Sequence, residues 1–170
     1  MEKEIYKGSI LRLTEERIES TVWERVYLPS GVIIFPITNE GKIILIKERR
    51  PHESPQMRIK PISGILESEK GTPLENAQRE MQEEIGLRAE RMELLWTLTS
   101  TGTVNNTQYF FTAHGLSSSK IPNPDGEDIV LEIIEYDPQE LLSAILEDKI
   151  KWSMSTLGIF RLFKSLRLSI

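Results

Sequence analysis

The sequence contains no cysteine and only two histidines. Disulfides, thiolate nucleophiles and cysteine-based zinc sites are therefore excluded. The two histidines, His52 and His114, have no partners at metal-ligand spacing, so we do not expect an imidazole-based metal site. No serine or histidine is accompanied by the neighbours that activate a nucleophile, and this disfavours covalent catalysis.

Long apolar runs are missing as well, because no stretch reaches the length needed to span a membrane. The N-terminal residues lack the apolar core of a signal peptide. The formal net charge is −5, so the chain has no global basic field that would attract nucleic acid. We therefore expect a cytoplasmic protein that binds neither membranes nor nucleic acid, and its 170 residues predict a single domain over 1–170. A small phosphorylated ligand would need only a local positive patch.

The first part of the chain has the patterns of β-strands. Residues 4–28 are predicted to form two short strands, with the polar stretch Glu15–Ser20 as the turn between them. Two apolar runs follow at 32–37 and 42–47, separated by a short polar segment. This segment ends at Gly41, which suits a tight turn, and the pattern predicts a β-hairpin.

The best-marked helix begins near Thr72. Thr72 suits the N-cap, Pro73 suits the first helical position, and Glu75 completes a capping box. Gly86 is placed to end the helix. Apolar residues recur at helical spacing between these ends and form one stripe: Leu74, Ala77, Met81 and Ile85.

The second part of the chain alternates predicted strands and helices. Strands are expected at 93–99, 108–113 and 129–136, and helices at about 137–146 and 153–166. Strands interleaved with three helices favour an α/β sandwich around a mixed sheet.

Three glutamates in the well-marked helix, Glu80, Glu83 and Glu84, stand at i, i+3 and i+4 and project from neighbouring positions. Their like charges repel one another, and the ordinary explanation for such a cluster is a solvated acidic face. A hard divalent cation is the other explanation, because Mg²⁺ and Mn²⁺ prefer carboxylate oxygens as ligands. Two features favour this second explanation: Arg79 directly precedes the cluster, and Glu84 borders the apolar stripe.

The stretch REMQEEIGL, residues 79–87, resembles the second half of the Nudix box, R-E-U-x-E-E-x-G-U, where U is bulky and apolar. Every fixed position of this half matches. The chain is thus similar to Nudix hydrolases, and the resemblance implies a Nudix-type α/β/α sandwich around a mixed β-sheet.

The first half of the box departs from the pattern. Its leading glycine corresponds to Gly64, but the stretch from there to Arg79 is one residue longer than the pattern requires. Counting back from Arg79 places Gly71 where the box has its first glutamate. Glu67 and Glu69 are the two carboxylates that we expect to substitute as the partner of Arg79, and the sequence leaves the choice between them open.

Features outside the box resemble the ADP-ribose and nucleoside-diphosphate-sugar pyrophosphatase branch of the family. The run LIKERR, residues 45–50, is similar to the strand with a basic end that precedes a loop in that branch. The run KPISG, residues 60–64, stands where that branch has E-L-P-A-G, so Lys60 replaces an acidic residue. Thr101 takes the place of a proline that the ADP-ribose group usually has before its glycine, here Gly102.

The resemblance also implies a metal site. Glu80 and Glu84 would bind Mg²⁺ (or Mn²⁺), with Glu83 as a further ligand or as the residue that orients the water. The backbone carbonyl of Ser63 would be another ligand. Arg79 would lock the preceding loop to the helix and hold the glutamates in place.

Other candidate residues lie outside the helix. The loop 123–128 resembles an acidic loop of this branch, and Glu127 is the candidate general base or additional ligand, with an ordinary acidic turn as the alternative. Arg50 and Arg49 are candidates for binding phosphate oxygens, which guanidinium groups match in geometry, although a solvated basic pair is the alternative. Trp23 is a candidate for stacking on a nucleobase, and packing in the core or in a dimer interface is its alternative.

The resemblance implies a metal-dependent hydrolase that cleaves the pyrophosphate of a nucleoside diphosphate linked to another moiety, of the ADP-ribose or nucleotide-sugar type, and releases a nucleoside monophosphate. It also implies that residues 1–30 contribute to a homodimer. One alternative is a catalytically weakened Nudix domain that acts as a nucleotide-binding or protein-interaction module, which Gly71 and Lys60 support. Another is a hydrolase of RNA ends or dinucleoside polyphosphates, and the lack of a clustered basic stripe argues against RNA.

Overall fold

The structure, a computed structural model, describes residues 1–122 and 130–168. Its strands are β1 (Lys3–Lys7), β2 (Arg12–Ile18), β3 (Thr21–Tyr27), β4 (Gly31–Pro36), β5 (Ile43–Arg49), β6 (Met57–Lys60), β7 (Ile62–Ile65), β8 (Leu87–Ser100), β9 (Val104–Ser118) and β10 (Val130–Tyr136). Its helices are α1 (Pro73–Ile85), α2 (Pro138–Leu146) and α3 (Ser153–Ser165), with a short 3-10 turn, η1 (Ser68–Lys70).

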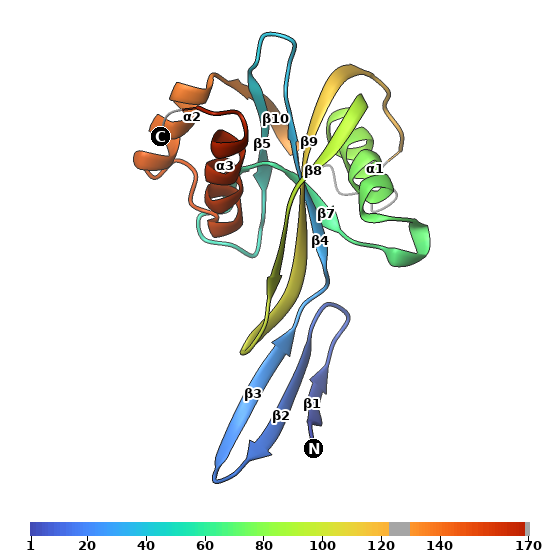
Figure 1. Ribbon diagram of the computed structural model, residues 1–170, viewed down its shortest axis with the longest axis vertical. Helices are drawn as coiled ribbons and strands as arrows, with labels where there is room; N and C mark the ends of the chain where they lie inside the picture. Colours follow the sequence, from blue (N-terminus) through green and yellow to red (C-terminus); the bar gives the residue numbers. More distant parts are fainter. Residues whose placement is uncertain (123–129, 169–170) are drawn as a thin grey trace.

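The strands form one sheet of seven and one of three. The larger sheet has the order β1-β2-β3-β9-β4-β7, with β8 also paired to β9, and the smaller has the order β10-β5-β6. Helix α1 lies on one side of the central strands, and α2 and α3 lie on the other (Figure 1). Because β4 runs parallel to β9 and antiparallel to β7, the sheet is mixed. The expected α/β/α sandwich around a mixed sheet is therefore confirmed.

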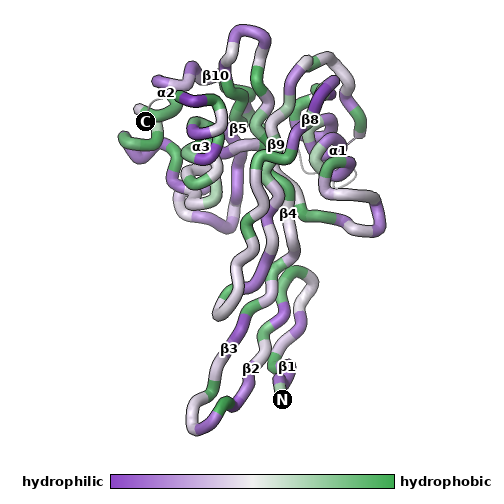
Figure 2. Tube along the Cα trace, viewed as in Figure 1, coloured by the Kyte–Doolittle hydropathy of each residue, from purple (hydrophilic) through white to green (hydrophobic). Residues whose placement is uncertain are grey.

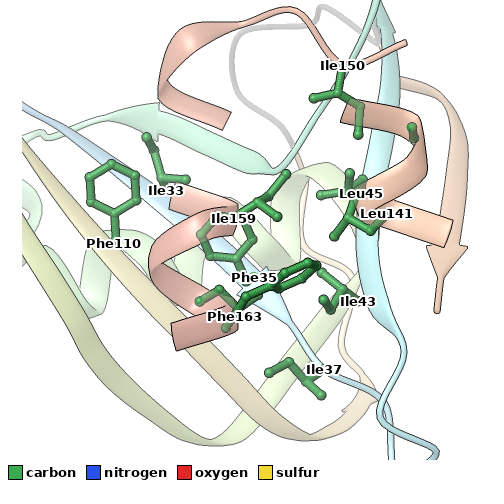
Figure 3. Close-up of a cluster of buried hydrophobic side chains, with 12 residues drawn as sticks. Ile33, Phe35, Ile37, Ile43, Leu45, Phe110, Leu141, Ile150, Ile159 and Phe163 are labelled. Carbon is green, nitrogen blue, oxygen red and sulfur yellow. The ribbon is translucent and has the colours of Figure 1, made fainter. Parts of the chain in front are cut away.

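Strand β4 is buried along its whole length because it has a hydrophobic core on each face. Ile33 and Phe35 face the core beneath α2 and α3, whereas Val32 and Ile34 face the core beneath α1. This alternation follows from the two-residue period of a strand. Figure 3 shows the first of these cores, in which the rings of Phe35 and Phe163 lie among aliphatic side chains.

Helix α1 forms as its sequence predicts. The Thr72 side chain accepts a hydrogen bond from the Glu75 backbone N–H at 3.3 Å, and the Glu75 carboxylate accepts one from the Thr72 N–H at 2.7 Å. This is a complete capping box. At the other end Gly86 adopts a left-handed conformation with φ 69°, as the C-cap requires.

Two predictions about the strands are wrong. The turn expected at Glu15–Ser20 is much shorter, because β2 continues through Ile18 in register with β3. The hairpin expected from the two apolar runs forms only at its turn: Gly41 has φ 83° and the Thr38 N–H donates to the Lys42 carbonyl at 2.9 Å. Beyond the bridge between Ile37 and Ile43, the described strands β4 and β5 do not pair with each other and belong to different sheets. Both strands have apolar residues on both faces, so the apolar pattern does not show which strands they pair with.

Strands β1 to β3 project away from the body of the molecule (Figure 1). Hydrophobic and hydrophilic residues are interspersed along them (Figure 2). They are connected to the rest of the larger sheet where β3 pairs with β9, through Val26 opposite Val104 and Tyr27 opposite Asn105. None of the helices in the described part of the chain is both long and apolar enough to cross a membrane.

Candidate functional site

The glutamates of α1 lie against strand β7. The Ser63 backbone N–H donates a hydrogen bond to the Glu84 carboxylate at 3.4 Å. The Glu80 carboxylate lies so close to Gly64 that a side-chain carbon at position 64 would overlap it. The glycine at this position is therefore explained by the close approach of a carboxylate to the main chain.

Arg79 joins the loop before α1 to the glutamate cluster. Its guanidinium group lies 3.3 Å from Glu67, 3.7 Å from Glu80 and 3.6 Å from Glu83. Of the two carboxylates that the sequence offers as the partner of Arg79, the structure therefore selects Glu67 over Glu69. Since Arg79 contacts the loop and two of the glutamates together, it can hold them in a common geometry.

A residue that sequence reasoning missed holds the same loop. Asn76 is fully buried, and its amide group donates to the backbone carbonyls of Glu67, Gly71 and Thr72 at 3.0–3.2 Å. Its carbonyl oxygen accepts from Arg79 at 2.8 Å. The available signal was its position beside the apolar stripe, where a polar residue must find partners when it is buried.

The cluster carries negative charge that its surroundings compensate only in part. Burial raises the pKa of Glu80 to about 7, and repulsion from Glu84 and Glu83 adds to the effect. Burial also raises the pKa of Glu84, against the opposing attraction of the Lys60 ammonium group. A cation placed among these carboxylates would favour their charged forms and relieve the repulsion.

Lys60 is fully buried next to this cluster. Its ammonium group donates to the Ser63 hydroxyl at 2.8 Å and lies 3.4 Å from Glu48 and 3.7 Å from Glu84. Glu48 is also fully buried and accepts from Arg58 at 2.6 Å. Burial alone would raise the pKa of Glu48, but Lys60 and the neighbouring guanidinium groups together lower it.

The remaining predicted site residues lie in different parts of the structure and differ in exposure. Arg50 is partly buried, and its guanidinium donates to Glu48 at 2.9 Å, so part of its hydrogen-bonding capacity is already used. Arg49 is exposed at the end of β5. Trp23 is exposed on β3, in the projecting strands and apart from α1 (Figure 1). Glu127 lies outside the residues that the structure describes.

The donor chemistry of the cluster fits a hard divalent cation, since carboxylate oxygens in excess of nearby positive charge are the ligands such ions prefer. Over residues 1–122 and 130–168, however, no three acidic or histidine side chains already stand in an arrangement that could hold a metal ion. The residues that could bind one are Glu80, Glu83 and Glu84, with the Ser63 main chain adjacent.

Comparison with known proteins decides the family. The model of the NUDIX domain matches residues 27–155. The chain belongs to the Nudix family. It is 30% identical to the methanol dehydrogenase activator of Bacillus methanolicus over 164 residues, covering 92% of this chain and 87% of that protein. It is 28% identical to the ADP-ribose pyrophosphatase of Bacillus subtilis (strain 168) over 150 residues, covering 84% and 80%.

A solved structure has the same fold. It is described as an ADP compounds hydrolase and superposes on this Nudix chain with a TM-score of 0.83, covering 98% of this chain and 92% of that one at 16% identity. The similarity to the ADP-ribose pyrophosphatase branch that the sequence indicated is therefore confirmed, and the chain is a Nudix hydrolase. Nudix enzymes generally use divalent metal ions.

Proposed function

We propose that this Nudix hydrolase cleaves the pyrophosphate of a nucleoside diphosphate linked to another moiety and releases a nucleoside monophosphate. One arrangement carries the proposal: Arg79 ties Glu67 of the loop to a helix face whose glutamates lie against Ser63 and Gly64. The relative named ADP-ribose pyrophosphatase favours a substrate of the ADP-ribose or nucleotide-sugar type.

In this proposal Glu80 and Glu84 hold Mg²⁺ or Mn²⁺ together with the Ser63 carbonyl, and Glu83 is a further ligand or orients the water. When bound, the ion would offset charge on the phosphoryl oxygens and acidify a water molecule. Glu127 accepts the proton of the attacking water. The P–O bond of the linkage breaks as the new P–O bond forms.

The proposed substrate contacts lie outside the glutamate cluster. Arg50 and Arg49 would bind phosphate oxygens, and Trp23 would contact the base. Arg50 is connected to the cluster through ion pairs, because it lies 2.9 Å from Glu48, and Lys60 lies 3.4 Å from Glu48 and 3.7 Å from Glu84. Trp23 lies on the projecting strands, so its contact with a substrate would require a partner subunit.

The test measures the turnover of ADP-ribose, several nucleotide sugars and diadenosine polyphosphates in the presence of Mg²⁺ or Mn²⁺. The released nucleoside monophosphate is quantified by chromatography. Loss of an outer partner of a metal site already costs about 10–100-fold, so Glu84→Gln should lower turnover by at least about a hundredfold. Glu93→Gln, which changes an exposed glutamate of β8 in the same way, should leave turnover unchanged. Equal rates in the wild type and Glu84→Gln would contradict the proposed site.

A second candidate function is a weakened Nudix domain that binds a nucleotide or a protein partner. The observation that favours it is the ammonium group of Lys60 at 3.7 Å from Glu84. The relative named methanol dehydrogenase activator is compatible with a role of this kind. Thermal-shift binding of the same panel without any cleavage would support this second function and exclude the first.

A further inference from the structure

Lys60 is the only lysine or arginine that is buried in the described part of the chain. An ammonium group is costly to remove from water unless it is paired. Strand pairing places it here: Lys60 lies opposite Ile46 on β5, and Ile46 faces the core beneath α1. Because opposite residues of paired strands point to the same face, the Lys60 side chain is directed toward α1 and its glutamates.

The two carboxylates beside Lys60 differ in their other partners. Glu48 also forms ion pairs with Arg50 at 2.9 Å and with Arg58 at 2.6 Å, so Lys60 is its third cation. For Glu84, Lys60 is the cation within ion-pair distance among the described residues. Without Lys60, Glu48 would keep two guanidinium partners, whereas Glu84 would lose the cation that lies within ion-pair distance of it.

We propose that Lys60 is a resident cation of the glutamate cluster, a positioning residue whose ammonium group offsets part of the Glu84 charge and weakens the binding of divalent ions there. The inference rests on the proposed function, since it assumes that Glu84 belongs to a metal site. A divalent ion beside Glu84 would stand near a fixed positive charge, and the two would repel. Within the cluster Glu80 pairs with Arg79 at 3.7 Å rather than with Lys60, so the charge of Lys60 acts on Glu84.

A second contact adds to this role. The Lys60 ammonium donates to the Ser63 hydroxyl at 2.8 Å, and the Ser63 N–H donates to Glu84 at 3.4 Å. Lys60 thus holds strand β7, whose main chain lies against the cluster.

The experiment is a titration of the full chain with Mn²⁺ alone. Binding is measured by calorimetry and by the electron paramagnetic resonance signal of the free ion. Lys60→Gln removes the charge and keeps a donor for the Ser63 hydroxyl, and Lys60→Met is a second neutral variant. We expect each to bind Mn²⁺ about tenfold more tightly than the wild type, or to bind one ion more; a tenfold change corresponds to about 1.4 kcal/mol. Lys47→Gln is the matched control, because Lys47 is half-exposed on β5 and pairs with Glu132 at 3.7 Å.

The outcomes separate this inference from the proposed function. Equal Mn²⁺ affinity and stoichiometry in the wild type and Lys60→Gln would overturn the role of Lys60 and leave the proposed function standing. Absence of Mn²⁺ binding in every protein would overturn both. A purely structural lysine would lower the unfolding temperature of the variants without tightening Mn²⁺ binding, and that result would also overturn the inference.

Discussion

Glu80 is the residue at which burial and charge conflict most clearly. Its carboxyl group lies over Gly64, beside two other glutamates, with Arg79 at 3.7 Å as its compensating cation. The resulting pKa of about 7 exceeds the ordinary value of 4.5. The folded protein therefore retains a proton on Glu80 in a pH range where the unfolded chain has lost it.

This difference predicts a pH dependence for the metal-free protein. A raised carboxyl pKa favours the folded state below the unfolded pKa of 4.5, and this advantage is lost as pH rises to about 7. Between these limits the free energy of unfolding should fall by on the order of 3 kcal/mol on account of Glu80. Urea unfolding of chelator-treated protein at a series of pH values measures the effect.

Glu80→Gln is the variant that tests this assignment. It should show a flatter pH profile, with a remaining slope from Glu84, whose pKa is raised in the same direction. The exposed Glu93→Gln should follow the wild type. Parallel profiles for the wild type and Glu80→Gln would show that Glu80 does not titrate as its surroundings indicate.

At the scale of elements, the loop between β7 and α1 contacts α1 although its length departs from the spacing of the Nudix box. The loop is one residue longer than the pattern, yet Glu67 still reaches Arg79 at 3.3 Å. Asn76 makes this possible, because it binds three carbonyls of the loop from the buried face of the helix. The extra residue is thus accommodated in the loop while the helix keeps its own pattern.

Glu67 and Glu69 form a matched pair for testing this lock. Glu67→Gln should lower turnover of the best substrate by about 10–100-fold, as expected for a group that orients metal-site residues. Glu69 is exposed, so Glu69→Gln should have no effect. Steady-state kinetics of both variants would measure this, and equal activity in Glu67→Gln and Glu69→Gln would contradict the role of Glu67.

At the scale of the whole molecule, the projecting strands β1 to β3 lack a core of their own. All five residues of β1 are exposed. A three-stranded sheet with apolar side chains open to solvent gains stability from a covering partner. The exposed apolar residues of this region are Ile5, Tyr6, Ile10, Leu11, Ile18, Val22, Trp23 and Leu28.

We therefore expect a homodimer in solution, formed through these strands. Light scattering after size-exclusion chromatography should give twice the chain mass of 19.6 kDa. Trp23→Glu should shift the protein toward the monomer, because a charge would be buried in the interface. Leu146→Glu places the same charge on an even more accessible apolar position of α2 and should leave the dimer intact. A monomeric wild type would refute the expectation.

The sequence by itself determined the features that depend on neighbouring residues. The capping box of Thr72 and Glu75 and the left-handed Gly86 involve residues at the two ends of one helix, so the bounds of α1 were predictable. Of the expected apolar stripe, Ala77, Met81 and Ile85 are buried, but Leu74 is exposed. The adjacent positions of Glu80, Glu83 and Glu84 follow from helical geometry for the same reason. The resemblance to the Nudix family rested on residues 79–87, which are also close together in the chain.

The tertiary structure alone decided which distant residues meet. The strands β4 and β5 are buried on both faces, so their apolar runs have no alternation that shows which strands they pair with, and long-range pairing places them in two different sheets. The partner of Arg79 depended on how the lengthened loop folds over Asn76. The position of Lys60 beside Glu84 depended on strand pairing between β5 and β6 and on the packing of α1, because such contacts are set by long-range register rather than by local sequence.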